Sequence, residues 1–390
     1  MFKEKKTNFF QAINAWLHLW LGLVSGIIVF VLSITGCVLV FEHDIKDLVY
    51  NYISVEEQTT DKQLPPSVIY QKIKEFYPDK EVGSLWYYGL DKSIKASINH
   101  SDTLLYVNPY TGKILAEVDH EDIFHFMDEG HRHFWIHGKL GHQIVGWGTF
   151  VFFLVTLSGV ILWWPKRWTK RMVKQSFTIN WKAKLKRINY DLHNVLGFYS
   201  LLLALLMGLT GLIMAFPWMR KSVMWLSGGL PPRVKMEKVE PGLTTPAMQD
   251  ALVVADKIWY KVRKEIALLN KEAIIVHIPE EDEQTIYACT DMHSGRWRDL
   301  RFDRNTITLL PNSQKPMSEA RAAEWISRSN YALHTGFIGG MTTKIMYFLA
   351  SLICASLPIT GFYVWWGKKK KAKKKTNRRV ISTKGQAELS

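Results

Sequence analysis

Four segments of this 390-residue chain are long enough and apolar enough to cross a lipid bilayer. They cover roughly residues 16–41, 143–164, 193–216 and 343–366. A helix needs about 20 mostly apolar residues to span the hydrocarbon layer, and each segment reaches that length. Hydrophobic residues make up 47% of the chain while its mean hydropathy is near zero, as expected when apolar blocks alternate with polar ones. We therefore predict an integral membrane bundle of four helices.

Basic residues near the span ends predict the orientation of the chain, because Lys and Arg mark the cytoplasmic side. They concentrate before the first span, between the second and third, and after the fourth: Lys3, Lys5, Lys6; Lys166, Arg167, Lys170, Arg171, Lys174, Lys182, Lys184, Lys186, Arg187; and the run GKKKKAKKKTNRR. We therefore expect both termini and the central loop inside. This topology accounts for the net charge of +15 without a nucleic-acid partner, and it places the basic segments against lipid headgroups.

A sequence repeat relates the two halves of the chain. Leu-His-x-x-Leu-Gly occurs at residues 17–22 and again at 192–197. Eighteen residues separate each His from a later glycine, which follows Thr35 in the first span and Thr210 in the third. The other two spans end alike, in Ser158-Gly159-Val-Ile-Leu-Trp-Trp and Thr360-Gly361-Phe-Tyr-Val-Trp-Trp. We interpret spans one and two as one half, and spans three and four as a second half of the same design.

The two long segments between spans have α+β patterns. In the first, residues 64–78 have helical periodicity, and residues 83–90, 93–99 and 103–118 favour short strands. Asn108-Pro-Tyr-Thr-Gly112 is typical of a turn between two strands. The second segment repeats this order, with a helical stretch at 245–262 before strand-like stretches at 273–279, 284–291 and 297–303. Each half is therefore expected to carry one α+β domain outside the membrane.

These patterns predict eight successive parts of the chain. They are a cytoplasmic N-terminus with span one (1–43), an outer domain (44–130), span two (131–166), a basic loop (167–190), span three (191–216), a second outer domain (217–332), span four (333–367) and a basic tail (368–390). The first span is too long for a signal peptide and ends without a small-residue cleavage site, so we expect it to stay as an anchor.

The motif YVNPYTGKIL resembles the strand-turn-strand signature of PepSY domains, and the spans with their Leu-His and Thr/Ser-Gly motifs resemble the PepSY-associated transmembrane family. The likeness covers residues 12–367. It implies two periplasmic PepSY-like domains in a protein of the bacterial inner membrane. Members of that family include reductases of ferric siderophores that carry b-type haem. The resemblance therefore implies haem b, a ferric siderophore or other ferric chelate as substrate, and a separate electron donor.

Two histidines at equivalent positions are the first candidate haem ligands. His18 and His193 both lie at the expected cytoplasmic mouth of a span, where an ionisable side chain is costly and needs a reason. A pseudo-two-fold axis along the membrane normal would turn one toward the other. Since a six-coordinate haem iron takes one axial nitrogen from each face, we expect this pair to hold a haem.

A second pair is expected on the periplasmic side, which would bring the number of haems to two. His334 lies 27 residues before Gly361, and its counterpart should lie 26 to 28 residues before Gly159. His131 and His133 both meet that spacing. His131 fits the family pattern better, although Gly130 stands where Leu is usual. The alternates are His133, His137 and His142, and a metal site remains open because His133 and His137, four residues apart, would share one helix face.

Two other functional classes remain open from the sequence. A haem-free PepSY-type protein could bind or regulate a periplasmic partner, and an absorption spectrum separates it from a reductase. A transporter of iron or siderophore is disfavoured because acidic residues, Glu42 and Asp191, occur only at span margins. No glycine-rich dinucleotide fingerprint follows a strand, so the donor must be another molecule. Three cysteines without a CxxCH motif support neither a disulfide framework nor covalent haem attachment.

Overall fold

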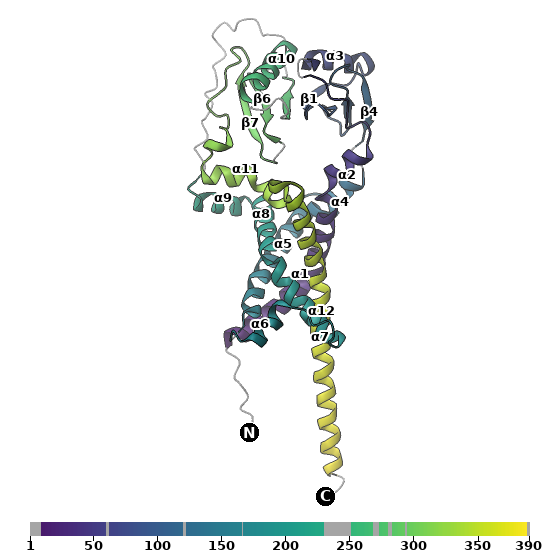
Figure 1. Ribbon diagram of the computed structural model, residues 1–390, viewed down its shortest axis with the longest axis vertical. Helices are drawn as coiled ribbons and strands as arrows, with labels where there is room; N and C mark the ends of the chain where they lie inside the picture. The colour runs from purple at the N-terminus through teal and green to yellow at the C-terminus, as the bar shows by residue number, and fades with distance from the viewer. Residues whose placement is uncertain are drawn as a thin grey trace. The chain divides into compact units, whose positions relative to one another are not determined.

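The computed structural model describes residues 9–59, 62–119, 122–165, 167–229, 251–267, 273–279, 283–292 and 295–387, with side chains up to Gly367 (Figure 1). Lys3, Lys5, Lys6, Lys166, the side chains of the C-terminal basic run and the start of the helix expected at 245–262 lie outside the described residues. The chain forms two compact units. We call Met1–Val40, Phe126–Pro217 and Met341–Ser390 the membrane unit, and Phe41–His125 with Trp218–Gly340 the sheet unit.

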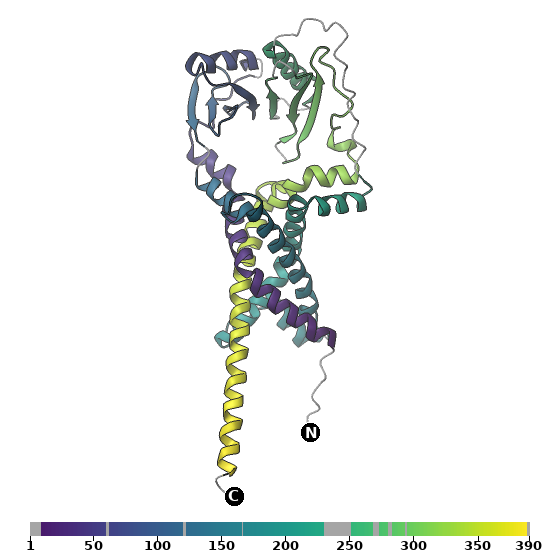
Figure 2. The ribbon, with the colours of Figure 1, turned by 180° about the vertical axis from the view of Figure 1, so that it is seen from behind.

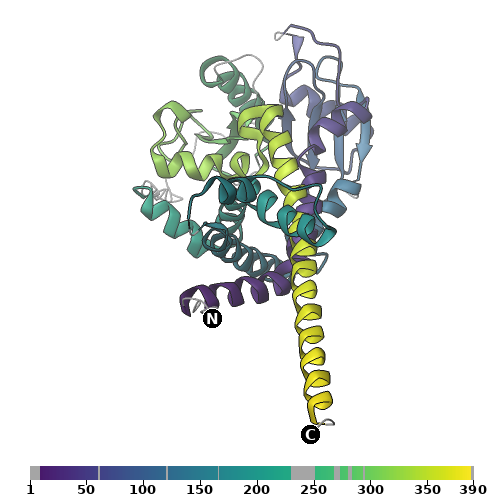
Figure 3. The same cartoon turned by 60° about the horizontal axis from the view of Figure 1, so that its bottom comes forward.

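The membrane unit contains the four predicted spanning helices. Its elements are α1 (Phe9–Leu39), most of α4 (Ile123–His133), α5 (Lys139–Trp163), α6 (Lys170–Phe177), α7 (Leu185–Asp191), a π-helical turn η2 (Leu192–Leu196), α8 (Gly197–Ala215) and α12 (Gly340–Ala387). Among the described residues, four helical stretches are long and apolar enough to cross a membrane: Phe9–Leu39, Lys139–Trp163, Leu185–Ala215 and Phe337–Gly367. The prediction of four spans is confirmed, and α12 continues as a helix well past the last of them (Figure 3).

Glycines let the spanning helices approach closely. A Cβ atom at position 148 of α5 would lie 2.7 Å from Ile28 of α1, and one at Gly26 of α1 would lie 3.1 Å from Pro358 of α12. Apolar side chains gain no hydrophobic free energy by leaving lipid for a helix contact, so close van der Waals packing at small residues holds such bundles together.

The sheet unit is built from both outer segments. The first segment supplies α2 (Glu42–Val49), α3 (Pro66–Phe76), β1 (Val82–Tyr87), β2 (Ile94–Ile98), β3 (Leu104–Val107) and β4 (Ile114–Val118). The second supplies α9 (Pro217–Leu226), α10 (Ala251–Lys261), η3 (Val262–Ile266), β5 (Ile274–His277), β6 (Thr285–Thr290), β7 (Arg298–Asp303), η5 (Met317–Glu319), α11 (Ala322–Thr335) and η6 (Phe337–Gly339). These strands form one antiparallel sheet in the order β4-β3-β2-β1-β5-β6-β7.

The sequence did not reveal that the two outer segments share this sheet. β1 pairs antiparallel with β5, with Leu85 opposite Val276 and Tyr87 opposite Ile274. Helices α3 and α10 lie on the same face of the sheet (Figures 1 and 2), and Asp256 of α10 accepts hydrogen bonds from the backbone N–H and hydroxyl of Ser67 in α3. The two segments therefore form a single folded unit.

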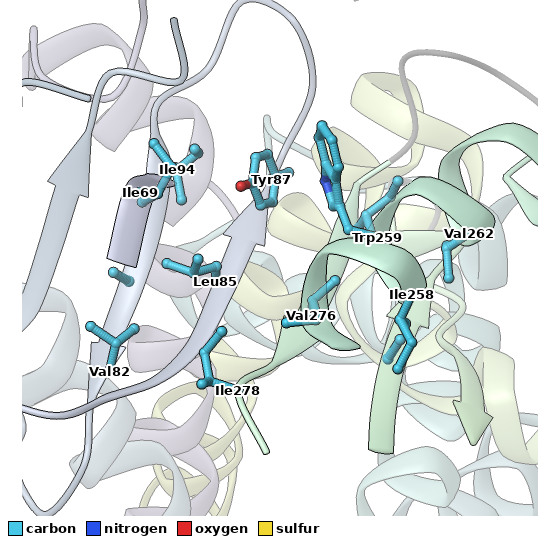
Figure 4. Close-up of a cluster of buried hydrophobic side chains, with 14 of the residues drawn as sticks. Ile69, Val82, Leu85, Tyr87, Ile94, Ile258, Trp259, Val262, Val276 and Ile278 are labelled. Carbon is cyan, nitrogen blue, oxygen red and sulfur yellow. The ribbon is translucent and has the colours of Figure 1, made fainter. Parts of the chain in front are cut away.

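One hydrophobic core runs beneath both helices (Figure 4). Strand residues alternate between the two faces of the sheet, so Leu85 and Tyr87 of β1 point to the helices and are almost fully buried. Trp259 of α10 is fully buried, and its ring centroid lies 5.2 Å from that of Tyr87. Tyr87 and Trp259 come from different outer segments, so the hydrophobic core is continuous across the pairing of β1 with β5.

The turn predicted at Asn108–Gly112 joins β3 to β4. The Asn108 side-chain oxygen accepts hydrogen bonds from the backbone N–H groups of Tyr110 (2.9 Å) and Thr111 (3.1 Å). Gly112 has a φ of +71°, which a residue without a side chain adopts at little cost. The predicted strand-turn-strand unit is confirmed.

Candidate functional site

His18 and His193 face each other inside the membrane unit. His18 lies on α1 and His193 on the π-helical turn η2, 175 residues later in the chain. Their ring centroids are 6.3 Å apart and their ring planes are inclined by 86°. The structure therefore brings together the two histidines that occupy equivalent positions in the sequence.

Each ring is held through its Nδ1 atom by a hydroxyl group near the end of another span. His18 Nδ1 lies 2.7 Å from Ser158 Oγ, and His193 Nδ1 lies 3.0 Å from Thr360 Oγ1. Within the described residues, neither Nε2 atom has a hydrogen-bond partner in the protein. The nitrogen that remains available on each ring is thus Nε2.

Asparagine side chains reinforce the same arrangement. The Asn14 amide, one turn before His18, donates to the carbonyl oxygen of Ser158 at 3.1 Å. The Asn189 amide, one turn before His193, donates to the carbonyl oxygen of Thr360 at 3.0 Å. The hydrogen bonds around His18 and around His193 are therefore made by residues at equivalent positions of the two halves. Asn-x-x-x-His-x-x-Leu-Gly is the sequence signal that would have revealed these contacts.

A glycine follows each hydroxyl residue because the imidazole ring lies directly against the helix there. A Cβ atom at Gly159 would lie 3.3 Å from His18 Cε1, and one at Gly361 would lie 3.2 Å from His193 Cε1. Ser158-Gly159 and Thr360-Gly361, noticed in the sequence only as parts of a repeat, are thus the contact sites of the His18 and His193 rings.

Packing around η2 fixes the position of His193. Asp191, fully buried just before the turn, forms an ion pair with Arg187 at 2.8 Å. The Trp163 ring stacks on Phe198 with centroids 3.9 Å apart and planes 11° apart. π-Helical turns are rare and occur frequently at functional sites. The chain thus departs from regular helix at the residue it presents to His18.

The geometry of this pair fits a six-coordinate haem. Imidazole nitrogen–metal bonds are about 2.0–2.1 Å long, so two axial imidazoles place their ring centroids roughly 6 Å apart. The observed separation is 6.3 Å. Two rings held at Nδ1, with Nε2 available, supply the donor set that an iron with axial ligands on both faces requires.

His131 is held in the same manner by the first span. It lies in the last turn of α4, with its Nδ1 atom 2.9 Å from Thr35 Oγ1. A Cβ atom at Gly36 would lie 3.3 Å from His131 Cε1. The unusual Gly130 also has a physical reason, because any side chain there would overlap the Trp135 ring, which donates a hydrogen bond to the Phe126 carbonyl.

The alternates to His131 have other surroundings. His133 is the last residue of α4, and residues 134–138 are not helical, so the expectation that His133 and His137 share a helix face is wrong. His137 is exposed. No group of three or more His, Cys, Asp or Glu side chains in the described part of the chain is placed to hold a metal ion.

His133 and His142 nevertheless form a second close pair. Their ring centroids are 6.2 Å apart with planes inclined by 45°. His133 Nδ1 lies 3.3 Å from a Glu129 carboxylate oxygen, and His142 Nε2 donates to the Ala215 carbonyl at 3.1 Å. Neither ring lies on a Ser/Thr-Gly motif, which distinguishes them from His18, His193 and His131.

His334 belongs to the sheet unit. It lies one residue before the end of α11, and Gly336, with φ of +78°, separates that helix from the spanning helix. His334 therefore does not open span four, as the sequence suggested, but lies in the last turn of the helix before it. His131 likewise precedes its spanning helix. Because the two residues belong to different units, their pairing stays a prediction.

The spanning helices and the sheet define a multi-pass membrane protein with a large α+β unit made from the segments between its spans. The family described as the PepSY-associated TM region matches residues 15–368, and the chain belongs to that family. No curated protein matches the sequence.

Proposed function

We propose that this chain is a b-type haem protein of the bacterial inner membrane that passes electrons across the membrane to a periplasmic ferric siderophore. In this proposal the chain consists of two repeated halves, each with a PepSY-like domain, and the two domains share the sheet. Both termini are cytoplasmic, and the segments that form the sheet unit are periplasmic. The protein is then a ferric-chelate reductase that frees iron for uptake.

The observation that carries the proposal is the geometry of His18 and His193. Their separation, their Nδ1 contacts and their available Nε2 atoms suit two axial ligands of one iron. A haem bound there supplies reversible one-electron transfer. The protein's own part is to orient the two imidazoles, to keep the pocket apolar and to exclude water. The family match supports the membrane setting.

A second haem between His131 and His334 completes the proposed path. His18 and Thr35 lie 17 residues apart on α1, which corresponds to roughly 26 Å of helix. Thr35 holds His131, so histidines lie near both ends of a span that covers most of the ~30 Å hydrocarbon layer. Redox centres at both levels would connect the two faces of the membrane.

Ferric chelates suit this outer end chemically. Siderophores hold Fe(III) through hard oxygen ligands, and one-electron reduction to Fe(II) weakens that hold, so the metal is released. No acid or base catalyst is needed for this substrate. The electron donor is a separate molecule that reaches the cytoplasmic end of the bundle.

The haem content of the purified chain tests the proposal most directly. We expect an absorption spectrum of low-spin b-type haem and a pyridine-haemochrome count of two haems per polypeptide. A count of one haem would contradict the second haem site at His131 and His334 and would leave the proposed site at His18 and His193. A protein that contains no haem when expressed with haem supply, and that binds none when haem is added, would contradict the proposal and favour the haem-free regulatory class.

The proposed orientation makes a separate prediction. Reporter fusions at Gly112, in the β3–β4 turn, and at Gly295 should be active only in an assay that requires export to the periplasm. A fusion within the basic loop, after Lys182, is the matched control and should report the cytoplasm. Cytoplasmic activity at either outer position would overturn the orientation that the positive charges predict.

A further inference from the structure

The hydroxyl groups that contact the histidines also donate hydrogen bonds to backbone carbonyls of their own helices. Thr360 Oγ1 lies within donating distance of the carbonyl oxygens of Ser356 (3.0 Å) and Leu357 (3.1 Å), which are four and three residues earlier in α12. Ser158 Oγ donates to the Val155 carbonyl at 2.8 Å. Thr35 Oγ1, which holds His131, does the same to the carbonyls of residues 31 and 32.

A hydroxyl group has one proton to donate and lone pairs to accept with. When that proton points to a carbonyl of its own helix, the oxygen can only accept from the histidine. The histidine must then donate, so its proton lies on Nδ1 and the lone pair lies on Nε2. The direction of this short chain of hydrogen bonds, from imidazole to hydroxyl to carbonyl, thereby sets the tautomer of the ring.

We propose that Thr360, Ser158 and Thr35 are positioning residues that fix His193, His18 and His131 in the Nδ1–H tautomer before any cofactor binds. A ring in that form presents a metal-binding lone pair in the direction that its hydroxyl partner dictates. The metal-independent part of this proposal rests on the hydrogen bonds alone. Its consequences for haem rest on the proposed function.

The chemical nature of the partner also sets how strongly the imidazole donates electrons. An acceptor on Nδ1–H raises the basicity of a ligating imidazole, and a charged carboxylate does so more than a neutral hydroxyl. These sites use hydroxyl groups, so each ring remains a neutral ligand of moderate donor strength. Removing the hydroxyl should weaken donation to ferric iron and raise the midpoint potential of that haem.

The two inner sites should respond alike. A backbone carbonyl three residues before each hydroxyl residue is a second acceptor for the ring: the Val155 carbonyl for His18, at 3.2 Å from Nδ1, and the Leu357 carbonyl for His193. Each carbonyl can take over part of the role of a lost hydroxyl. Thr360→Val and Ser158→Ala should therefore have effects of similar size, each on the haem signal of its own histidine.

Nuclear magnetic resonance of haem-free full-length protein tests the tautomer without any cofactor. The protein, labelled with ¹⁵N and ¹³C in histidine and reconstituted in lipid nanodiscs, should show His193 protonated on Nδ1; His193→Gln assigns the signal. In Thr360→Val that signal should shift or split between tautomers, and Thr360→Ser should restore it. A wild-type His193 protonated on Nε2 overturns the inference and leaves the haem proposal standing.

Redox titration of haem-loaded protein tests the consequence. In Thr360→Val we expect one of the two Nernst components to move to higher potential and haem affinity to fall roughly 10- to 100-fold. Thr360→Ser should behave as wild type.

The matched control is Thr156→Val, which removes a hydroxyl that donates to the Phe152 carbonyl of α5 in the same manner. Equal potentials and affinities in wild type and Thr360→Val overturn the inference. A protein that binds no haem refutes the proposed function while the resonance experiment still decides the tautomer.

Discussion

Replacing His193 by alanine is expected to remove the spectrum of one low-spin haem, and replacing His18 should have the same effect. The two rings lie 6.3 Å apart. In the proposed site each ring would bind one face of the same haem, so loss of either would leave the iron with a single imidazole ligand. The double variant should be little worse than either single one. Electron paramagnetic resonance and the α-band of the reduced protein measure the number of six-coordinate centres.

The control for this pair is His100→Ala, since His100 is an exposed residue of the sheet unit. It should keep the wild-type spectrum. A full complement of bis-imidazole haem in both His18→Ala and His193→Ala would show that the close approach of these rings has another purpose, such as helix packing.

The second large effect is expected at the outer pair. His334→Ala should leave the inner haem reducible by the donor yet abolish reduction of an external ferric chelate, because electrons could no longer leave the membrane. His131→Ala should behave in the same way, since its ring is held by Thr35 and Gly36 as the inner rings are held by their motifs.

Sealed proteoliposomes with enclosed reductant allow this measurement, with an Fe(II)-trapping dye outside, on the face proposed to be periplasmic. His137→Ala is the matched control because His137 is exposed and lies between α4 and α5. His133→Ala and His142→Ala should also retain activity. If these two variants lose activity while His131→Ala stays active, His133 and His142 would be the outer haem ligands in place of His131. An undiminished dye signal in His334→Ala would contradict a path through two haems.

The spanning helices and the β3–β4 hairpin could be predicted because their signals are local. Twenty apolar residues in a row specify a span without reference to the rest of the chain. The turn at Asn108–Gly112 is encoded by an asparagine that caps it and a glycine that accepts a positive φ. The repeat in the sequence also led directly to His18 and His193, which the structure brings together.

Other features depend on contacts between distant segments. Nothing within β1 or β5 indicates that Leu85 lies opposite Val276, because strand pairing leaves no local pattern. The helix break after His133 follows from the Trp135 ring packing against Gly130, and spacing alone suggested one continuous helix face. The Ser/Thr-Gly motifs were visible, but only the three-dimensional arrangement could show that histidines from other helices lie against Gly36, Gly159 and Gly361.

The shared sheet also imposes an order of events during synthesis. β1 is made early, yet its partner β5 follows only after about 190 further residues, which at roughly 5–20 residues per second takes on the order of 10–40 s. For that interval one edge of β1 has no partner, and unpaired strand edges readily join other chains. The first outer segment therefore keeps an unpaired strand edge, which can pair with other chains, until the third span and β5 have been synthesised.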